Sequence, residues 1–96
     1  MPAYVVAYSA VNDPEAMGRY VSSAGPITES HGGRYLFAGP GAETLDGEWP
    51  GDSLAIIEFP TREAAMRWYE SSEYAEVKPL RAAAGPTGLV LTPDVQ

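Results

Sequence analysis

The chain contains no cysteine and only one histidine among its 96 residues. The lack of cysteine excludes disulfides, thiolate chemistry and cysteine-based zinc sites. A single histidine does not form a standard transition-metal site, and the acidic residues lack the spacing of a calcium-binding loop. The glycines of residues 39–44 do not match a dinucleotide-binding loop. We therefore expect no metal site and no bound cofactor.

Basic residues are also scarce. Six Lys and Arg stand against 13 Asp and Glu, which gives a net charge of −7. Nucleic acids and anionic membrane surfaces are bound through clustered basic residues, so we expect neither as a partner. No apolar run approaches the roughly 20 residues of a membrane span. The N-terminal residues lack the basic segment of a secretory signal, and we expect a cytoplasmic protein.

The remaining composition is that of a small globular protein. A chain of this length can bury one modest core, so we expect one domain over residues 1–96. Residues 4–11, 34–38, 53–59 and 87–92 are rich in β-branched and aromatic side chains, which predicts four strands. Asp13 and Thr61 are capping residues at the starts of two helical patterns, residues 14–31 and 62–81.

Proline and glycine predict where these elements are interrupted. Gly25-Pro26 is expected to kink or briefly break the first helix, and Pro79 to bend the second helical region. Ser72 can begin a separate helical segment within that region. Gly39-Pro40-Gly41 predicts a bulge or bend after the second strand, before an extended run over residues 42–45.

The order strand, helix, strand, strand, helix, strand is that of a ferredoxin-like fold. This α+β class has a four-stranded antiparallel sheet with both helices on one face. Residues 54–59 read Leu-Ala-Ile-Ile-Glu-Phe and are apolar on both sides of the predicted strand, apart from Glu58. The sheet face without helices therefore needs a cover, and the simplest cover is a second copy of the chain.

Several segments in order resemble one small bacterial family. They are Asp13-Pro14-Glu15, Gly32-Gly33-Arg34-Tyr35-Leu36, Leu45-Asp46-Gly47-Glu48-Trp49-Pro50, Ile57-Glu58-Phe59-Pro60 and Trp68-Tyr69-Glu70-Ser71-Ser72-Glu73-Tyr74. This set is similar to domain of unknown function 1330 (DUF 1330), in the dimeric α/β-barrel superfamily. The resemblance implies a homodimer in which the sheets of two protomers pack together to close an α/β barrel.

The resemblance supplies no reaction. Superfamily relatives include quinol-type monooxygenases, haem-degrading oxygenases, lactone isomerases and polyketide cyclases, which place substrates between the sheet and the helices, but fold does not fix chemistry. Two cationic positions of the family pattern are absent: Ala38 stands where Arg is common, and Gly51-Asp52 follows the Trp-Pro segment. Both departures remove cationic groups that could hold a carboxylate or phosphate, so they weigh against any anionic substrate that the resemblance implies.

His31 and Glu58 are the candidate catalytic residues. His31 is the one side chain whose unperturbed pKa lies near neutrality, which suits a general acid or base; it can equally bind the free carbonyls of a helix C-terminus. Glu58, in an apolar strand, could transfer protons if desolvated. Alternatively, it pairs with Arg34, Arg81 or a tyrosine hydroxyl.

Tyr8, Tyr35, Tyr69 and Arg81 are the candidate substrate-binding residues. The tyrosines could line a pocket for a flat apolar ligand, or they could be part of the core. Arg81 could anchor an anion, or it could bind helix-end carbonyls or the acids Glu73 and Glu76.

Two functional hypotheses follow. The first is a homodimeric small-molecule-binding protein or cofactor-independent enzyme, acting by proton transfer or oxygenation on an apolar or aromatic substrate. The second is a non-catalytic structural or regulatory homodimer. A substrate-like pocket into which Glu58 or His31 opens favours the first hypothesis, which fails if both side chains are packed away from every cavity. The absence of any pocket above about 300 Å³, the lower limit of typical ligand sites, favours the second.

Overall fold

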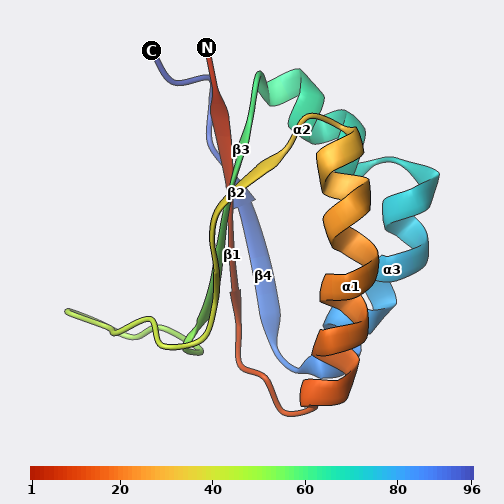
Figure 1. Cartoon of the computed structure of the whole chain (residues 1–96). Helices are drawn as coiled ribbons and strands as arrows, with labels where there is room; N and C mark the ends of the chain where they lie inside the picture. The colour runs from red at the N-terminus through yellow and green to blue at the C-terminus, as the bar shows by residue number, and fades with distance from the viewer.

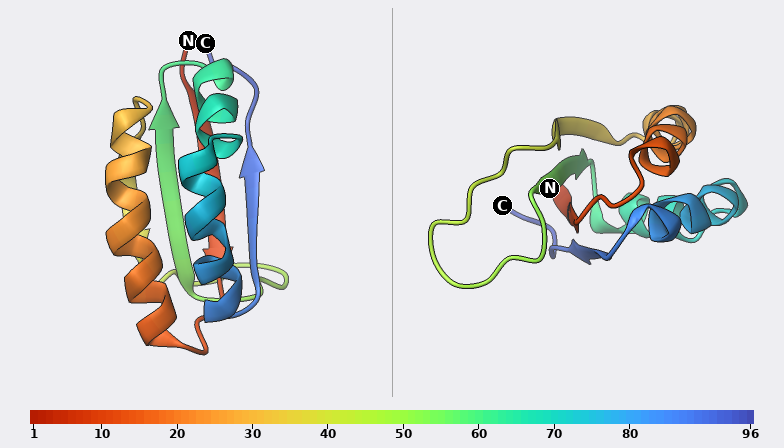
Figure 2. Two further views of the ribbon diagram at one scale, coloured as in Figure 1. Left: turned by 90° about the vertical axis from the view of Figure 1, so that its right-hand side faces the viewer. Right: turned by 90° about the horizontal axis from the view of Figure 1, so that it is seen from below.

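The computed structural model describes all residues, 1–96, as one four-stranded sheet and three helices (Figure 1). The elements are β1 (Ala3–Ser9), α1 (Pro14–Ser30), β2 (Arg34–Gly39), β3 (Ser53–Phe59), α2 (Arg62–Tyr69), α3 (Ser72–Ala84) and β4 (Thr87–Leu91). The strand order is β2-β3-β1-β4, and every neighbouring pair is antiparallel. All three helices cover the same side of the sheet (Figures 1 and 2). The α+β, ferredoxin-like fold predicted from the sequence is confirmed.

The helices begin where short polar side chains cap them. Asp13 accepts hydrogen bonds from the backbone N–H groups of Glu15 and Ala16, both at 3.1 Å. Thr61 accepts one from Ala64 at 3.0 Å, as its position predicted. The third cap is Ser71 and not Ser72, so α3 begins at Ser72, one residue earlier than a cap at Ser72 would place it.

Of the two outcomes expected at Gly25-Pro26, a kink or a brief break, the break does not occur, because α1 is continuous from Pro14 to Ser30. Proline removes one backbone hydrogen bond, but Ala24 and Thr28 on either side are completely buried against the core. Their packing holds the helix together across the missing bond. Likewise, α3 continues through Pro79.

The segment between β2 and β3 forms a long loop. β2 ends at Gly39, next to Pro40, which cannot donate to a strand ladder, and its irregularity lies earlier, between Tyr35 and Phe37. The extended run expected at residues 42–45 is not a strand. The loop projects on the side of the sheet opposite the helices (Figures 1 and 2). Leu45, within it, is 92% exposed.

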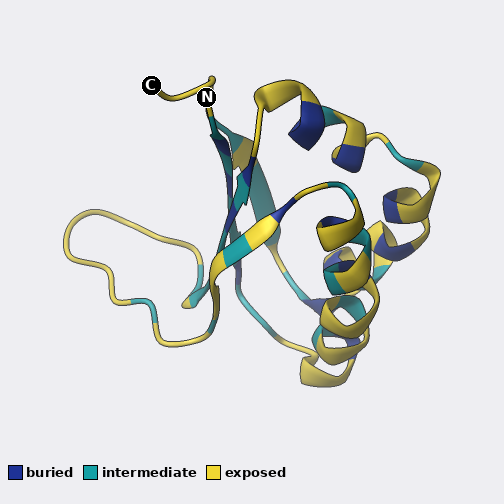
Figure 3. Ribbon diagram, turned by 45° about the horizontal axis from the view of Figure 1, so that its top comes forward, coloured by how far each residue is buried: buried dark blue, intermediate teal, exposed yellow.

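The core lies between the sheet and the helices, where burial is deepest (Figure 3). Phe59, Trp68 and Tyr74 are its largest fully buried side chains. Phe59 and Trp68 pack with tilted rings and centroids 5.3 Å apart, and Trp68 and Tyr74 do so with centroids 4.5 Å apart. This aromatic cluster fixes α2 and α3 against β3.

The other face of the sheet, here called the open face, has no helix over it (Figures 1 and 2). Side chains alternate along a strand, and Val5 and Ile57 are buried on the helix side, so their neighbours point the other way. Val6 is paired with both Ile56 and Val90 at the middle of this face. Val90 is 63% exposed. The expectation of strands apolar on both sides is therefore met.

Candidate functional site

A cavity of about 510 Å³ lies between the sheet and helices α1 and α3. Ten of the 17 residues that line it are hydrophobic. Its apolar wall includes Ala7, Ala55, Ile57 and Leu89 from the sheet and Met17 and Val21 from α1. The side chains of Ala7 and Ala55 are small, and they leave space between the sheet and the helices.

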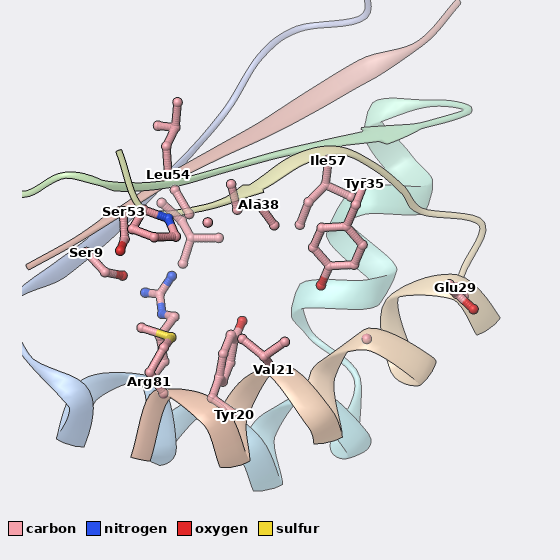
Figure 4. Close-up of a pocket in the computed structure, with 17 residues that line it drawn as sticks. Ser9, Tyr20, Val21, Glu29, Tyr35, Ala38, Ser53, Leu54, Ile57 and Arg81 are labelled. Atoms are coloured by element: carbon pink, nitrogen blue, oxygen red, sulfur yellow. The ribbon is translucent and has the colours of Figure 1, made fainter. Parts of the chain in front are cut away.

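Polar groups converge on this cavity from different elements. Ser9 and Ser53 line one end, and the guanidinium of Arg81 extends toward them from α3 (Figure 4). The side chains of Tyr20 and Tyr35 also line the cavity. A mostly apolar pocket with a few convergent polar groups is the usual form of a small-molecule site.

The direction of the Tyr35 hydrogen bond follows from its neighbours. The Thr28 hydroxyl donates its single proton to the carbonyl of Ala24 at 2.8 Å. The Tyr35 hydroxyl, 3.1 Å from Thr28 Oγ1, must therefore donate to it. Burial raises the pKa of Tyr35 above its ordinary value, so the phenol stays protonated at neutral pH. A ligand in the cavity can use the Tyr35 oxygen as an acceptor.

Tyr20 bonds to the buried Tyr74, with hydroxyl oxygens 2.9 Å apart, and either can be the donor. Burial, and next the proximity of Tyr74, raise the pKa of Tyr20. When Tyr74 donates to Tyr20, the Tyr20 proton is free for an acceptor in the cavity. Tyr20 is thus a polar group of the cavity that was not among the candidate residues, although its spacing from Met17 and Val21 is that of one helix face.

Arg81 is the one cationic side chain of the cavity lining, and it is only 8% exposed. Its Nε and Nη1 atoms are buried and have no hydrogen-bond partner. No ion pair joins Arg81 to Glu73 or Glu76, which were the alternative partners expected from sequence. Two buried guanidinium nitrogens without a partner are energetically unfavourable, so they call for a functional explanation.

Glu58 lies on the open face and outside the cavity lining. It accepts hydrogen bonds from Arg34 at 2.9 Å and from the Tyr4 hydroxyl at 3.1 Å. The bond to Glu58 raises the pKa of Tyr4. The arrangement corresponds to the structural alternative, in which Glu58 pairs with Arg34 and a tyrosine.

His31 is at the C-terminal end of α1 and also outside the cavity lining. Its Nδ1 lies 2.9 Å from the carbonyl of Ile27, which requires a proton on Nδ1. Its Nε2 lies 3.8 Å from Glu73 on α3. These contacts are those expected of a histidine that binds helix-end carbonyls.

The other two predicted tyrosines lie apart from the cavity. Tyr8 packs on the open face against Trp49, with ring centroids 5.5 Å apart. Tyr69 borders a separate hollow of about 110 Å³ and accepts a hydrogen bond from Lys78 at 2.6 Å. Of the six predicted site residues, the structure therefore brings only Tyr35 and Arg81 together in the large cavity.

The fold and the cavity together define a class, a ferredoxin-like α+β protein with an internal pocket between its sheet and its helices. Within that class, the chain belongs to the family described as Domain of unknown function (DUF1330), which matches residues 2–95. The resemblance seen in the sequence is thus confirmed. No curated protein matches the chain.

Solved structures share the fold at low sequence identity. A protein of unknown function from Rhodopseudomonas palustris is 22% identical, with a TM-score of 0.75 over 99% of this chain and 83% of that one. A dimeric ferredoxin-like protein of unknown function from Thermobifida fusca is 13% identical, with a TM-score of 0.66 over 97% and 91%. SnoaB, a cofactor-independent oxygenase from Streptomyces nogalater, is 9% identical, with a TM-score of 0.67 over 99% and 93%.

Two further features bear on the chemistry. No three His, Cys, Asp or Glu side chains gather closely enough to hold a metal ion. None of the three helices is long and apolar enough to cross a bilayer.

Proposed function

We propose that this protein is a homodimer that binds a small, mainly apolar molecule in the cavity between the sheet and helices α1 and α3. The observation that carries the proposal is the cavity itself. Its volume of about 510 Å³ falls within the ~300–1,000 Å³ of small-molecule sites. Protein interiors are otherwise packed to a density that leaves few voids larger than a water molecule. A purely structural dimer, the alternative hypothesis, gives no reason for so large a space.

Ligand binding has better support than a particular reaction. The likeness to the SnoaB oxygenase extends to the fold alone. Proton transfer by His31 or Glu58 stays a prediction, and the geometry of the cavity does not support it, because neither residue lines the cavity. Any chemistry on a bound molecule would involve the groups that can touch it, which include the hydroxyls of Tyr20 and Tyr35. The cytoplasmic location also stays a prediction.

The open face supports the proposed dimer. Val6, Ile56 and Val90 form an apolar centre on it, and a second sheet packed there would bury them. The loop between β2 and β3 projects on this same side (Figure 1). It carries the exposed side chains of Leu45 and Trp49. Exposed apolar groups gathered on one side of a small protein are typical of an interaction surface.

Ligand binding can be tested by filling the cavity. Ala55 lines it, whereas Ala75 is exposed on α3, so Ala55→Met and Ala75→Met form a matched pair. We expect benzyl alcohol and indole to shift the amide NMR signals of cavity residues in the wild type and in Ala75→Met. Ala55→Met should weaken both shifts. Equal binding to all three proteins, or to none, would contradict a ligand site here.

Dimerisation can be tested with a charge on the open face. Val90→Glu places a carboxylate at its apolar centre, and Ser23→Asp adds one at an exposed position of α1. Sedimentation velocity should show a dimer for the wild type and for Ser23→Asp, and a monomer for Val90→Glu. A wild-type monomer at micromolar concentration would refute the proposed pairing.

A further inference from the structure

We infer that the ligand of this cavity is a small monocarboxylate: an apolar body with one carboxylate group, which binds the guanidinium of Arg81. The inference rests on the proposed function, because it assigns a chemical class to the molecule that occupies the same cavity. Three features of the structure carry it: the state of Arg81, the groups around it, and the balance of charge.

The first feature is a buried cation without a counterion. Arginine keeps its positive charge under all physiological conditions and has five N–H donors to satisfy. In this structure Nε and Nη1 are buried with no partner, and no carboxylate pairs with the side chain. Such an arrangement is costly in the empty protein. A carboxylate is the planar anion that a guanidinium matches best, through charge-assisted hydrogen bonds.

The second feature is the shape of the site around this cation. Arg81 reaches into the cavity from α3, and the remaining space is bordered by apolar groups such as Val21, Ile57 and Leu89 (Figure 4). Tyr20 lines the same cavity and can donate a hydrogen bond when Tyr74 donates to it. The site therefore combines a cation, a hydroxyl that can serve as a second donor, and an apolar wall, which suits an amphipathic acid.

The third feature distinguishes a carboxylate from a phosphate. Arg81 is the single cation in the lining, so a monocarboxylate would be neutralised by it. A phosphate monoester carries up to two negative charges and would leave one uncompensated in an apolar cavity. The net charge of −7 further disfavours a multiply charged ligand. Glu29 also lines the cavity but lies at the end remote from Arg81 (Figure 4).

This cation differs from those lost at Ala38 and at Gly51-Asp52. The resemblance implied cationic groups at those two positions, on β2 and in the loop after it, whereas Arg81 belongs to α3. The absence of the first two therefore does not remove the ability to hold an anion.

The test compares ligands of one shape and different charge. Benzoate, benzyl alcohol and phenyl phosphate are titrated by calorimetry into wild type, Arg81→Met and Arg81→Lys. Arg67→Met is the matched control, because Arg67 is exposed on α2 and bonded only to Glu63. Thermal unfolding and circular dichroism establish that each variant is folded before titration.

We expect wild type and Arg67→Met to bind benzoate more tightly than the other two probes. Arg81→Met should lose at least about tenfold in benzoate affinity, as for a lost pair of charge-assisted hydrogen bonds, and should keep its affinity for benzyl alcohol. Arg81→Lys should lie between them, because it keeps the charge without the planar fork.

Other results would overturn the inference in distinguishable ways. Equal benzoate affinity in wild type and Arg81→Met, or tightest binding of phenyl phosphate, refutes the carboxylate and leaves the ligand site in place. If benzyl alcohol is the only probe that binds, the carboxylate is likewise refuted and the ligand site stays in place. If no probe binds and Ala55→Met changes no NMR signal of an added ligand, the proposed function itself fails. If Arg81→Met is unfolded, the benzoate affinities of Arg81→Lys and wild type are compared instead, and equal affinities refute the carboxylate.

Discussion

The hydroxyl oxygens of Tyr20 and Tyr74 lie 2.9 Å apart and join α1 to α3 at the side of the cavity. Their rings meet edge to face, with centroids 6.3 Å apart. Tyr74 is completely buried, and Tyr20 is the one hydrogen-bond partner of its hydroxyl. The pair therefore fixes the spacing of two helices and the position of a cavity hydroxyl at once.

We predict that Tyr20→Phe destabilises the protein more than the loss of one ordinary hydrogen bond. The substitution leaves the buried Tyr74 hydroxyl without a partner, which costs about 1–3 kcal/mol. The double variant with Tyr74→Phe leaves no unpaired group, so its cost should be smaller than the sum of the single costs. Urea unfolding of the four proteins measures this difference. If the stability cost of the double variant equals the sum of the two single costs, the two hydroxyls do not depend on each other.

Stability should fall at high pH in part because of Tyr35. Burial raises its pKa in the folded protein, whereas the unfolded phenol ionises near pH 10. Above that pH the folded state binds more protons than the unfolded state, so stability is present below about pH 10 and is lost as the pH rises. Tyr35→Phe should show a smaller loss of unfolding free energy between about pH 8 and about pH 11 than wild type. Equal losses would contradict the assignment.

Gly88 is required because the ring of Tyr8 lies across it. A Cβ at Gly88 would be 2.6 Å from Cε1 of Tyr8, a contact that the sheet cannot accommodate without moving the ring. Gly88→Ala should cost about 1–3 kcal/mol and change the fluorescence of Trp49, which packs on Tyr8.

Gly18 provides the control for this substitution. It lies within α1 and has nothing within 4 Å of the added Cβ. Gly18→Ala should stabilise the protein by about 0.5–1 kcal/mol, because alanine loses less backbone entropy in a helix. A destabilising Gly18→Ala, or a neutral Gly88→Ala, would mean that the packing on these two faces differs from the structure.

Without ligand, Arg81→Met should make the protein more stable. Methionine keeps much of the aliphatic packing and removes a buried charge that has no partner. By analogy with buried ionic groups replaced by apolar ones, we expect a gain of about 1–4 kcal/mol. Chemical denaturation measures it, and Arg67→Met on the surface should change stability by less than about 1 kcal/mol. A loss of stability would indicate that Arg81 is paired in solution. A gain in stability in Arg81→Met would indicate that the protein keeps Arg81 for its function although the residue lowers stability.

The fold was predictable because its signals are local. Asp13 and Thr61 mark the starts of two helices by side-chain bonds to backbone atoms within three residues. Pro40 ends β2 because it has no N–H group. The continuity of α1 through Gly25-Pro26, where a kink or a break was expected, could not be predicted for the opposite reason: the packing of Ala24 and Thr28 is tertiary and is not visible in the local sequence.

The site was predicted only in part. Arg81 and Tyr35 were chosen by residue type and lie in the cavity, whereas Glu58 and Tyr8 are on the open face. Along a strand, a shift of one residue changes the face to which a side chain points. The register that pairs Tyr4 with Glu58, and so turns both away from the helices, depends on strand pairing across 54 positions of sequence.

The sequence by itself determined the order of elements, the chain's family and the apolar character of both sheet faces, because periodicity, caps and composition act over a few residues. Only the tertiary structure decided that Arg81 is buried without a partner beside Tyr20 and that His31 and Glu58 lie outside the cavity. Whether a charged side chain is paired depends on what distant segments bring to it, and that is a property of packing in three dimensions.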